Sequence, residues 1–135
     1  MATVDVNFAA VLVSALASMV VGAIWYSPAL FAKPWMELTG RRDMNPAEGA
    51  AVGYTTAAAG SLITAYILAH FVSYAGAVTA MDGAITGAWA WLGFNGVSML
   101  TTYTFAARPR KLWAIDSLQY LVVFVVMGMI LAVWH

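Results

Sequence analysis

The uncharged stretch at residues 6–32 reads VNFAAVLVSALASMVVGAIWYSPALFA, and it is bounded by Asp5 and Lys33. A helix needs about 20 apolar residues, each rising about 1.5 Å, to cross the core of a bilayer. This stretch is long enough, and a helix satisfies its own backbone groups in lipid. The N-terminus carries Asp5 and no Lys or Arg before the apolar run, unlike a signal peptide. We therefore expect a transmembrane helix of the mature protein.

Three further runs of the chain carry no charge. They lie between Glu48 and Asp82, between Asp82 and Arg108, and from Ser117 to the end. Each is long enough, or nearly so, to cross a bilayer as a helix. We predict an all-α integral membrane protein, a four-helix bundle that forms a single transmembrane domain over residues 1–135. Its spans are expected near residues 7–29, 47–74, 83–106 and 111–134.

The composition supports the same class of protein. Of the 135 residues, 63% are hydrophobic and only 9% are charged, whereas an ordinary soluble domain carries about 25% charge. The formal net charge is zero, which argues against a nucleic-acid binder, because such proteins present a basic face. The absence of cysteine excludes disulfides, iron–sulfur clusters and cysteine-based zinc sites. A soluble enzyme is therefore a poor fit to this chain.

The basic residues predict the orientation in the membrane. All six fall in the two loops that follow the first and third spans, on one side of a four-span protein. This is the positive-inside pattern, so we expect both basic loops inside and both termini outside. The residues are Lys33, Arg41 and Arg42 in the first loop, and Arg108, Arg110 and Lys111 in the second.

Prolines and glycines mark the predicted helix ends. Pro28 is expected to end or kink the first span, and Pro34 to open a short interfacial helix that stops at Gly40. Pro109 suits the first turn of the fourth span.

The second span is predicted to begin at a capping sequence. Asn45 would cap the helix, Pro46 would occupy its first position, and Glu48 would bond back to the cap.

Small residues recur every four positions in the first two spans. Apolar side chains gain little by leaving lipid for protein, so small residues that let backbones approach matter most. The stripes predict packing of these two spans on each other or on a neighbouring subunit. Residues 121–126 are bulky, which indicates a face toward lipid or another subunit. The packing residues are Ala10, Ser14, Ser18 and Gly22 in the first span, and Gly53, Ala57, Ser61 and Ala65 in the second.

Asp116 is the acid of greatest interest, because it lies one to two turns into the fourth span. An ionisable residue inside a membrane helix is a functional hypothesis by default. The ordinary interpretation places it at headgroup depth, paired with Arg108, Arg110 or Lys111. The alternative is a polar strip that continues through Tyr120, four residues further along the helix.

Two other polar residues lie within the predicted spans. His70 has Tyr66 and Tyr74 one turn away on either side, which is typical of an interfacial aromatic belt rather than of a metal or haem ligand. Asn95 lies in the middle of the third span and is expected to hydrogen-bond across helices. We predict no metal site and no catalytic set, and the sequence leaves any cofactor unknown.

Several short motifs resemble those of a known family. The first span ends in Trp25-Tyr26-Ser27-Pro28, followed by Leu30-Phe31 and Trp35, and the last quarter contains Arg108-Pro109, Leu112, Ile115-Asp116, Tyr120, Met127-Gly128 and Trp134. This pattern resembles the bacterial family catalogued as domain of unknown function 1761. The resemblance implies a small four-span protein of the bacterial inner (cytoplasmic) membrane. It brings no established activity, substrate or cofactor.

The leading functional hypothesis is a non-enzymatic module that assembles with itself or serves as an accessory subunit of a larger membrane complex. Its expected partners are the lipid bilayer and other protein chains, and not nucleic acid. The extensive small-residue faces and the lack of a reactive constellation favour this interpretation. An enzyme ranks last, because Asp116 and His70 fall near opposite faces of the membrane in this topology.

Two alternatives remain open. One is a small oligomeric transporter or channel with a polar path near Asp116, lined also by Tyr120, Asn95 and His70. The other is a binder of a lipid, quinone or pigment between helices. Trp89, Trp91 and Phe94 would then form the pocket wall.

Overall fold

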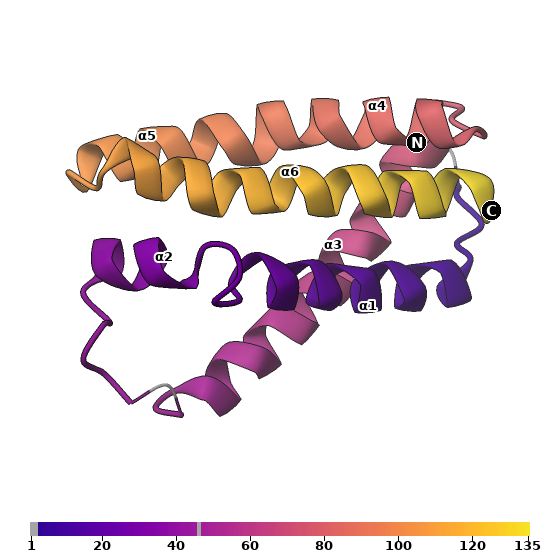
Figure 1. Ribbon diagram of the computed structural model, residues 1–135. Coiled ribbons are helices and arrows are strands. Elements are labelled where there is room, and N and C mark those ends of the chain that lie inside the picture. Colours follow the sequence, from indigo (N-terminus) through magenta and orange to yellow (C-terminus); the bar gives the residue numbers. More distant parts are fainter. Residues whose placement is uncertain (1–2, 46) are drawn as a thin grey trace.

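A computed structural model describes residues 3–45 and 47–135, and all the regular secondary structure in these residues is helical (Figure 1). The all-α prediction is therefore confirmed for the described part of the chain. The elements are α1 (Phe8–Trp25), α2 (Ala32–Thr39), α3 (Ala50–Tyr74), α4 (Ala80–Trp91), the π-helical segment η1 (Leu92–Gly96), α5 (Val97–Phe105) and α6 (Arg110–Val133).

Three of these helices, α1, α3 and α6, are long and apolar enough to cross a membrane. They coincide with the first, second and fourth predicted spans. The predicted third span at residues 83–106 coincides with α4, η1 and α5, which follow one another without a break as one rod (Figure 1).

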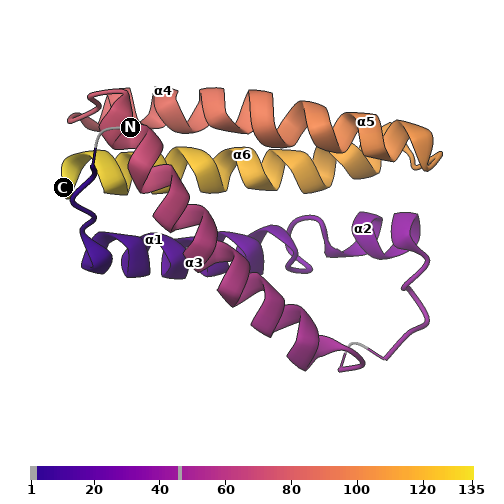
Figure 2. The same cartoon turned by 180° about the vertical axis from the view of Figure 1, so that it is seen from behind.

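The helices form a layer with one oblique helix across it. The α1 helix, the α6 helix and the α4–η1–α5 rod run side by side, with α6 in the middle (Figure 1). Figure 2, from behind, shows α3 crossing this layer at an angle. The start of α1 and the end of α6 lie together, where the Asn7 side-chain amide donates to the Trp134 carbonyl at 3.4 Å. The arrangement thus differs from a regular bundle of four near-parallel helices.

The α6 helix is the centre of the packing, because it contacts α1, α2, α3, α4 and α5. Val123 is only 2% exposed. The prediction that residues 121–126 face lipid or another subunit is therefore wrong at this position. The buried core gathers where the second half of α3 crosses α1, α4 and α6, and its largest members are Val11, Leu68, Val72, Val123, Met127 and Leu131.

Three glycines let the backbones of α4 and α6 approach closely. A Cβ atom on Gly83 or on Gly128 would collide with the carbonyl oxygen of the other residue. A Cβ atom on Gly87 would collide with the Phe124 carbonyl oxygen. Glycine is therefore required at these positions, and the two helices pack backbone to backbone as small-residue motifs allow in membranes.

The predicted ends of the first two helices are largely confirmed. The α1 helix ends at Trp25, three residues before Pro28, and α2 ends at Thr39, directly before Gly40, whose φ of 73° is the left-handed conformation of a helix C-terminus. Pro109 precedes α6 as its N-cap instead of occupying the first turn. This is a shift of one residue.

The predicted start of the second span is wrong. The α3 helix begins at Ala50, directly after Gly49, whose φ is 76°. The Asn45 side chain accepts from the Ala47 amide at 3.0 Å, but it caps an isolated turn. The left-handed Gly49 separates this turn from the helix. Pro46 lies outside the described residues.

Candidate functional site

Two tyrosines bind the carboxylate of Asp116. The Tyr26 hydroxyl donates to Oδ1 and the Tyr103 hydroxyl donates to Oδ2, each at 2.7 Å. Tyr26 is the C-cap of α1, Tyr103 lies in α5, and Asp116 lies in the second turn of α6. The half-buried carboxylate therefore connects three separate segments of the chain through short, charge-assisted hydrogen bonds.

This geometry corrects the expected pairing of Asp116 with the basic loop. The ion pair found in residues 3–45 and 47–135 is instead Arg42 with Glu37, at 3.6 Å between two exposed side chains. Arg108 and Arg110 are exposed at the turn between α5 and α6. Asp116 faces the two tyrosine hydroxyl groups, which take both of its oxygens.

Three indole groups bind backbone carbonyls around the same turn of α6. Trp25 donates to the Ile115 carbonyl at 2.9 Å, and Trp91 donates to the Ser117 carbonyl at 2.7 Å. In the opposite direction, Trp113 of α6 donates to the Gly96 carbonyl at 2.9 Å. Each bond crosses between helices, so the turn that carries Asp116 is held from both sides.

The π-helical segment η1 lies opposite this turn. The Val97 amide donates to the Leu92 carbonyl, which is the wider spacing of a π-helix. A Cβ atom on Gly96 would come within 2.9 Å of the Trp91 ring, so the glycine makes room for that indole. Short π segments are frequent at functional sites, and this one supplies the carbonyl that Trp113 binds.

Buried polar atoms near η1 and within the helix layer have no hydrogen-bond partner among the described residues. They are Asn95 Oδ1, Ser117 Oγ and Ser14 Oγ. Asn95 was expected to bond across helices, but its side-chain oxygen does not do so here. Leaving a buried polar atom unpaired costs about 1–3 kcal/mol, which marks these groups as candidates for interaction with water or a ligand.

Tyr120 does not join the Asp116 cluster. Its side chain is 43% exposed, and it makes no hydrogen bond in the described part of the chain. The Tyr120 hydroxyl is therefore not a hydrogen-bond partner of Asp116 in the described residues, and the predicted polar strip stays a prediction. The tyrosines that bind Asp116 come from other helices.

His70 occupies the aromatic row that the sequence predicted. Its Nδ1 lies 2.9 Å from the Tyr66 carbonyl oxygen, and its ring packs edge-on to Tyr66 and Tyr74 at 4.8 and 6.2 Å between centroids. His70 is near the end of α3, whereas Asp116 is near the start of α6, at the other end of the molecule (Figure 1). The two residues do not share a site.

The predicted packing of the first and second spans is correct for only part of the small-residue stripes. Ala10, Ser14 and Ala65 are fully buried, and Ser18 hydrogen-bonds Ser61 at 3.1 Å between α1 and α3. Gly22 faces the Gln119 side chain of α6.

Gly53 and Ala57 are exposed, so they do not pack on the first span. The cause is the oblique crossing of α3, which separates its first half from α1 (Figure 2). Packing on a neighbouring subunit, the other predicted partner, stays a prediction.

The Trp25-Tyr26-Ser27-Pro28 motif shapes the end of α1. Trp25 and Tyr26 bind α6 as described, and the Ser27 hydroxyl donates to the Ile24 carbonyl at 2.7 Å. Pro28 follows in the turn that leads to α2. The motif therefore ends the helix and joins it to the turn of Asp116.

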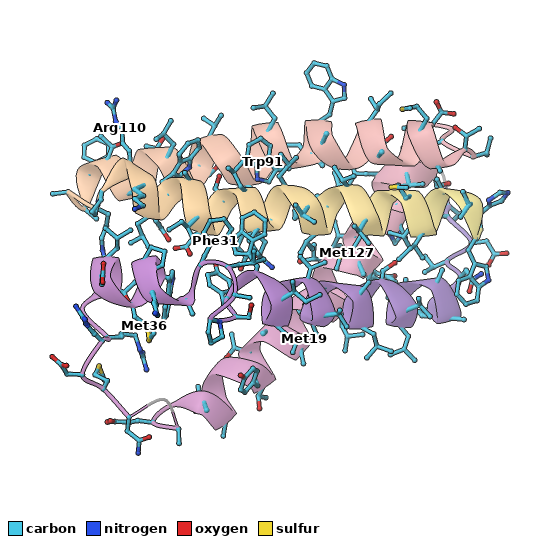
Figure 3. The ribbon with its side chains drawn as sticks, in the orientation of Figure 1. Met19, Phe31, Met36, Trp91, Arg110 and Met127 are labelled. Carbon is cyan, nitrogen blue, oxygen red and sulfur yellow. The ribbon has the colours of Figure 1, made fainter. Side chains whose placement is uncertain are left out.

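The predicted aromatic pocket wall does not form. Trp89 and Phe94 are 69% and 68% exposed, while Trp91 turns toward α6 (Figure 3). The three aromatic residues therefore do not line one pocket. Within residues 3–45 and 47–135, no group of three or more His, Asp or Glu side chains is placed to hold a metal ion.

One cavity of about 150 Å³ lies near the chain ends, and an open one of about 620 Å³ lies between α5 and α6. Asp116 lines neither of them.

Tyr103 and Ser117 could not be recognised from the sequence as residues of this site. The hydrogen bonds of the three indoles could not be predicted either. Tyr103 lies in the third span with no sequence signal that distinguishes it from other aromatic residues. Gly83 and Gly87 did carry a signal, because they are four residues apart, but their partner Gly128 could not be read from the sequence.

Comparison with known proteins identifies the family. The model of the family described as "Protein of unknown function (DUF1761)" matches residues 9–132, which is nearly the whole chain, so the protein belongs to that family. The resemblance carried by the Trp25–Pro28 motif and by Asp116 is thus confirmed. No curated protein and no solved structure gives a significant match.

Proposed function

We propose that this member of the DUF1761 family is a non-enzymatic membrane module that assembles with copies of itself. In this proposal it is a four-span protein of the bacterial inner membrane, and the α4–η1–α5 rod is the third span. The two basic loops face inside and both termini face outside. The support is that α2 and the α5–α6 turn, which border these loops, lie at the same end of the molecule (Figure 1).

The first half of α3 is the feature that carries the assembly proposal. Gly53, Ala57 and Gly60 are all exposed, and a Cβ atom on either glycine would meet nothing within 4 Å. Further along the same helix, Ser61 and Ala65 are used within the protomer. The face that contains Gly53, Ala57 and Gly60 is called the open α3 face below.

The composition of the open α3 face favours a protein partner over lipid. A glycine inside a helix costs about 1 kcal/mol relative to alanine, and lipid contact gives no compensation for that cost. Close packing of another helix backbone compensates for this cost, and glycines of α4 and α6 allow such packing within this protomer. We infer that a helix of a second copy packs against the open α3 face.

The test is to fill the open α3 face with bulk. Gly53→Leu/Ala57→Leu places two large side chains on this exposed face. Ala59→Leu is the matched control, because a residue two positions further along a helix points to the opposite side. Native mass spectrometry in lipid nanodiscs is expected to show an oligomer for the wild type and for Ala59→Leu, and a monomer for the double variant.

Two outcomes would count against the proposal. An unchanged oligomer in Gly53→Leu/Ala57→Leu would remove the open α3 face from the interface. A wild-type mass that contains a different protein, and one copy of this chain, would instead indicate an accessory subunit of a larger complex.

A small oligomeric transporter or channel is the second candidate. The observations that favour it are the lack of a basic partner for Asp116 among the described residues and the unpaired buried oxygens of Asn95 and Ser117. Flux assays in liposomes on Asp116→Asn test this candidate. Unchanged flux of every ion tested would remove Asp116 from a transport path.

A further inference from the structure

An open groove of about 620 Å³ lies between α5 and the first turns of α6. It is lined by Leu100, Thr104, Arg110, Lys111, Trp113 and Ala114. Arg110 and Lys111 are the first residues of α6, next to the α5–α6 turn, whereas Leu100 and Ala114 lie further along the two helices. In Figure 3 the Arg110 side chain extends outward from the end of the molecule where α5 and α6 meet.

The positive charge of this groove has no counterpart within residues 3–45 and 47–135. Neither Arg110 nor Lys111 forms an ion pair there. Asp116, the nearest carboxylate along α6, is bound by Tyr26 and Tyr103. The α6 helix also begins without a side-chain cap and without an acidic residue in its first turn. An anion would therefore meet uncompensated positive charge at the start of α6.

The polar groups in the rest of the groove already have hydrogen-bond partners, and the remaining residues offer apolar surface. The Trp113 indole is held by its hydrogen bond to the Gly96 carbonyl, and the Thr104 hydroxyl donates to the Leu100 carbonyl at 2.7 Å. Neither group needs a polar ligand. Leu100 and Ala114 add apolar surface beside the fixed indole ring. The groove thus matches a molecule with an anionic head and an apolar tail.

We propose that the groove is a binding site for an anionic membrane phospholipid. Its headgroup phosphate contacts Arg110 and Lys111, and the upper part of an acyl chain lies along Leu100 and Ala114. Basic pockets between membrane helices on the inner side are suited to such headgroups. This inference rests on the proposed membrane placement, but not on assembly through the open α3 face.

The experiment compares lipids of different headgroup charge on the intact chain. Protein is released from nanodiscs that contain equal amounts of phosphatidylglycerol and phosphatidylcholine with identical acyl chains, and native mass spectrometry records the lipid retained per protomer. The wild type is expected to retain phosphatidylglycerol preferentially. Arg110→Gln/Lys111→Gln is expected to lose about 30-fold of this preference, since each basic residue near an anionic surface contributes roughly a factor of five.

The matched control removes the same charge from the other basic loop. Arg41→Gln/Arg42→Gln is expected to keep the wild-type preference, because those residues do not line the groove. An equal loss in both double variants would overturn the proposal, since it would show a general charge effect. A wild type without preference would overturn it as well.

A steric variant tests the site with every charge in place. Ala114→Leu fills the groove and is expected to abolish preferential lipid retention, whether or not the charge variants fold. Retained lipid in folded Ala114→Leu would overturn the proposal. Millimolar inorganic phosphate is expected to leave the bound lipid in place, and displacement by phosphate alone would identify a free-anion site instead. The lipid count is taken per protomer, so failure here is distinguishable from failure of oligomer formation.

Discussion

The Tyr26 hydroxyl donates a 2.7 Å hydrogen bond to Asp116 Oδ1, which fixes the end of α1 to the second turn of α6. Tyr103 of α5 binds the other oxygen of the same carboxylate. The basic loops contribute no ion pair to this carboxylate in the described residues. Asp116 therefore connects α1 and α5 to α6, at the turn of α6 whose carbonyls also bind two indoles.

Tyr26→Phe is expected to weaken the contact between α1 and α6. The change removes one interhelical hydrogen bond and leaves the ring in place, so the free energy of unfolding should fall by about 1 kcal/mol, within the range for such bonds in membranes. Denaturation with increasing mole fraction of SDS in mixed micelles measures the effect. Tyr120→Phe is the control and should change nothing, because that hydroxyl makes no hydrogen bond among the described residues. An equal effect of both substitutions would contradict the assigned geometry.

Gly87→Ala is expected to separate α4 from α6. The added Cβ atom would collide with the Phe124 backbone, which cannot move without shifting the central helix. Overpacking of this kind costs about 3 kcal/mol. Gly60→Ala is the matched control, because its Cβ atom meets nothing in the protomer. It should stabilise the isolated protomer by about 0.5–1 kcal/mol through helix propensity. Similar stabilities for the two variants, measured by the same SDS titration, would argue against the close contact.

Ala107→Gly is expected to stabilise the turn between α5 and α6. Ala107 has a φ of 55°, and the Arg108 amide donates to the Tyr103 carbonyl across it. The left-handed conformation costs a residue with a side chain about 1 kcal/mol of conformational free energy, and glycine does not have this cost. Ala106 has an ordinary φ of −79°, so Ala106→Gly should give no gain. A thermal or SDS midpoint that falls in Ala107→Gly would show that the turn has a different backbone conformation.

Cysteine labelling tests the proposed orientation, and the chain has no cysteine of its own to interfere. Met44 lies in the loop before α3 and Val78 in the loop before α4, and both are exposed. With a membrane-impermeant thiol reagent on intact cells, Val78→Cys should be labelled and Met44→Cys should not. Permeabilised cells should label both. The reverse pattern would place the basic loops outside.

Much of the fold could be predicted, because helix positions and helix ends depend largely on charged residues, prolines and glycines close by in the sequence. The uncharged runs located the long helices, and Gly40 located the end of α2, since both signals depend on residues close in sequence. The start of α3 could not be predicted in the same way. The Asn45 sequence does form its turn, but the left-handed Gly49 intervenes, and its conformation depends on the path of the whole loop.

The site was less predictable, because its contacts join residues far apart in the chain. Asp116 could be singled out from its depth in the span, but its partners come from α1 and α5. Nothing in the spacing of Tyr26 or Tyr103 relates them to Asp116. The small-residue stripe of α3 shows the same limit. Spacing identified Gly53 and Ala57 as a packing face, but only the crossing angle of α3 decides that α1 does not cover it.

Disulfide crosslinking at the open α3 face tests whether two copies of the protein pack through this surface. Ala57→Cys is oxidised in native membranes and compared with Ala59→Cys, and the products are separated under non-reducing conditions. Assembly through the open α3 face predicts a crosslinked species of twice the protomer mass for Ala57→Cys and none for Ala59→Cys. Absence of that species from Ala57→Cys, or equal crosslinking of both variants, would contradict assembly of this protein through the open α3 face.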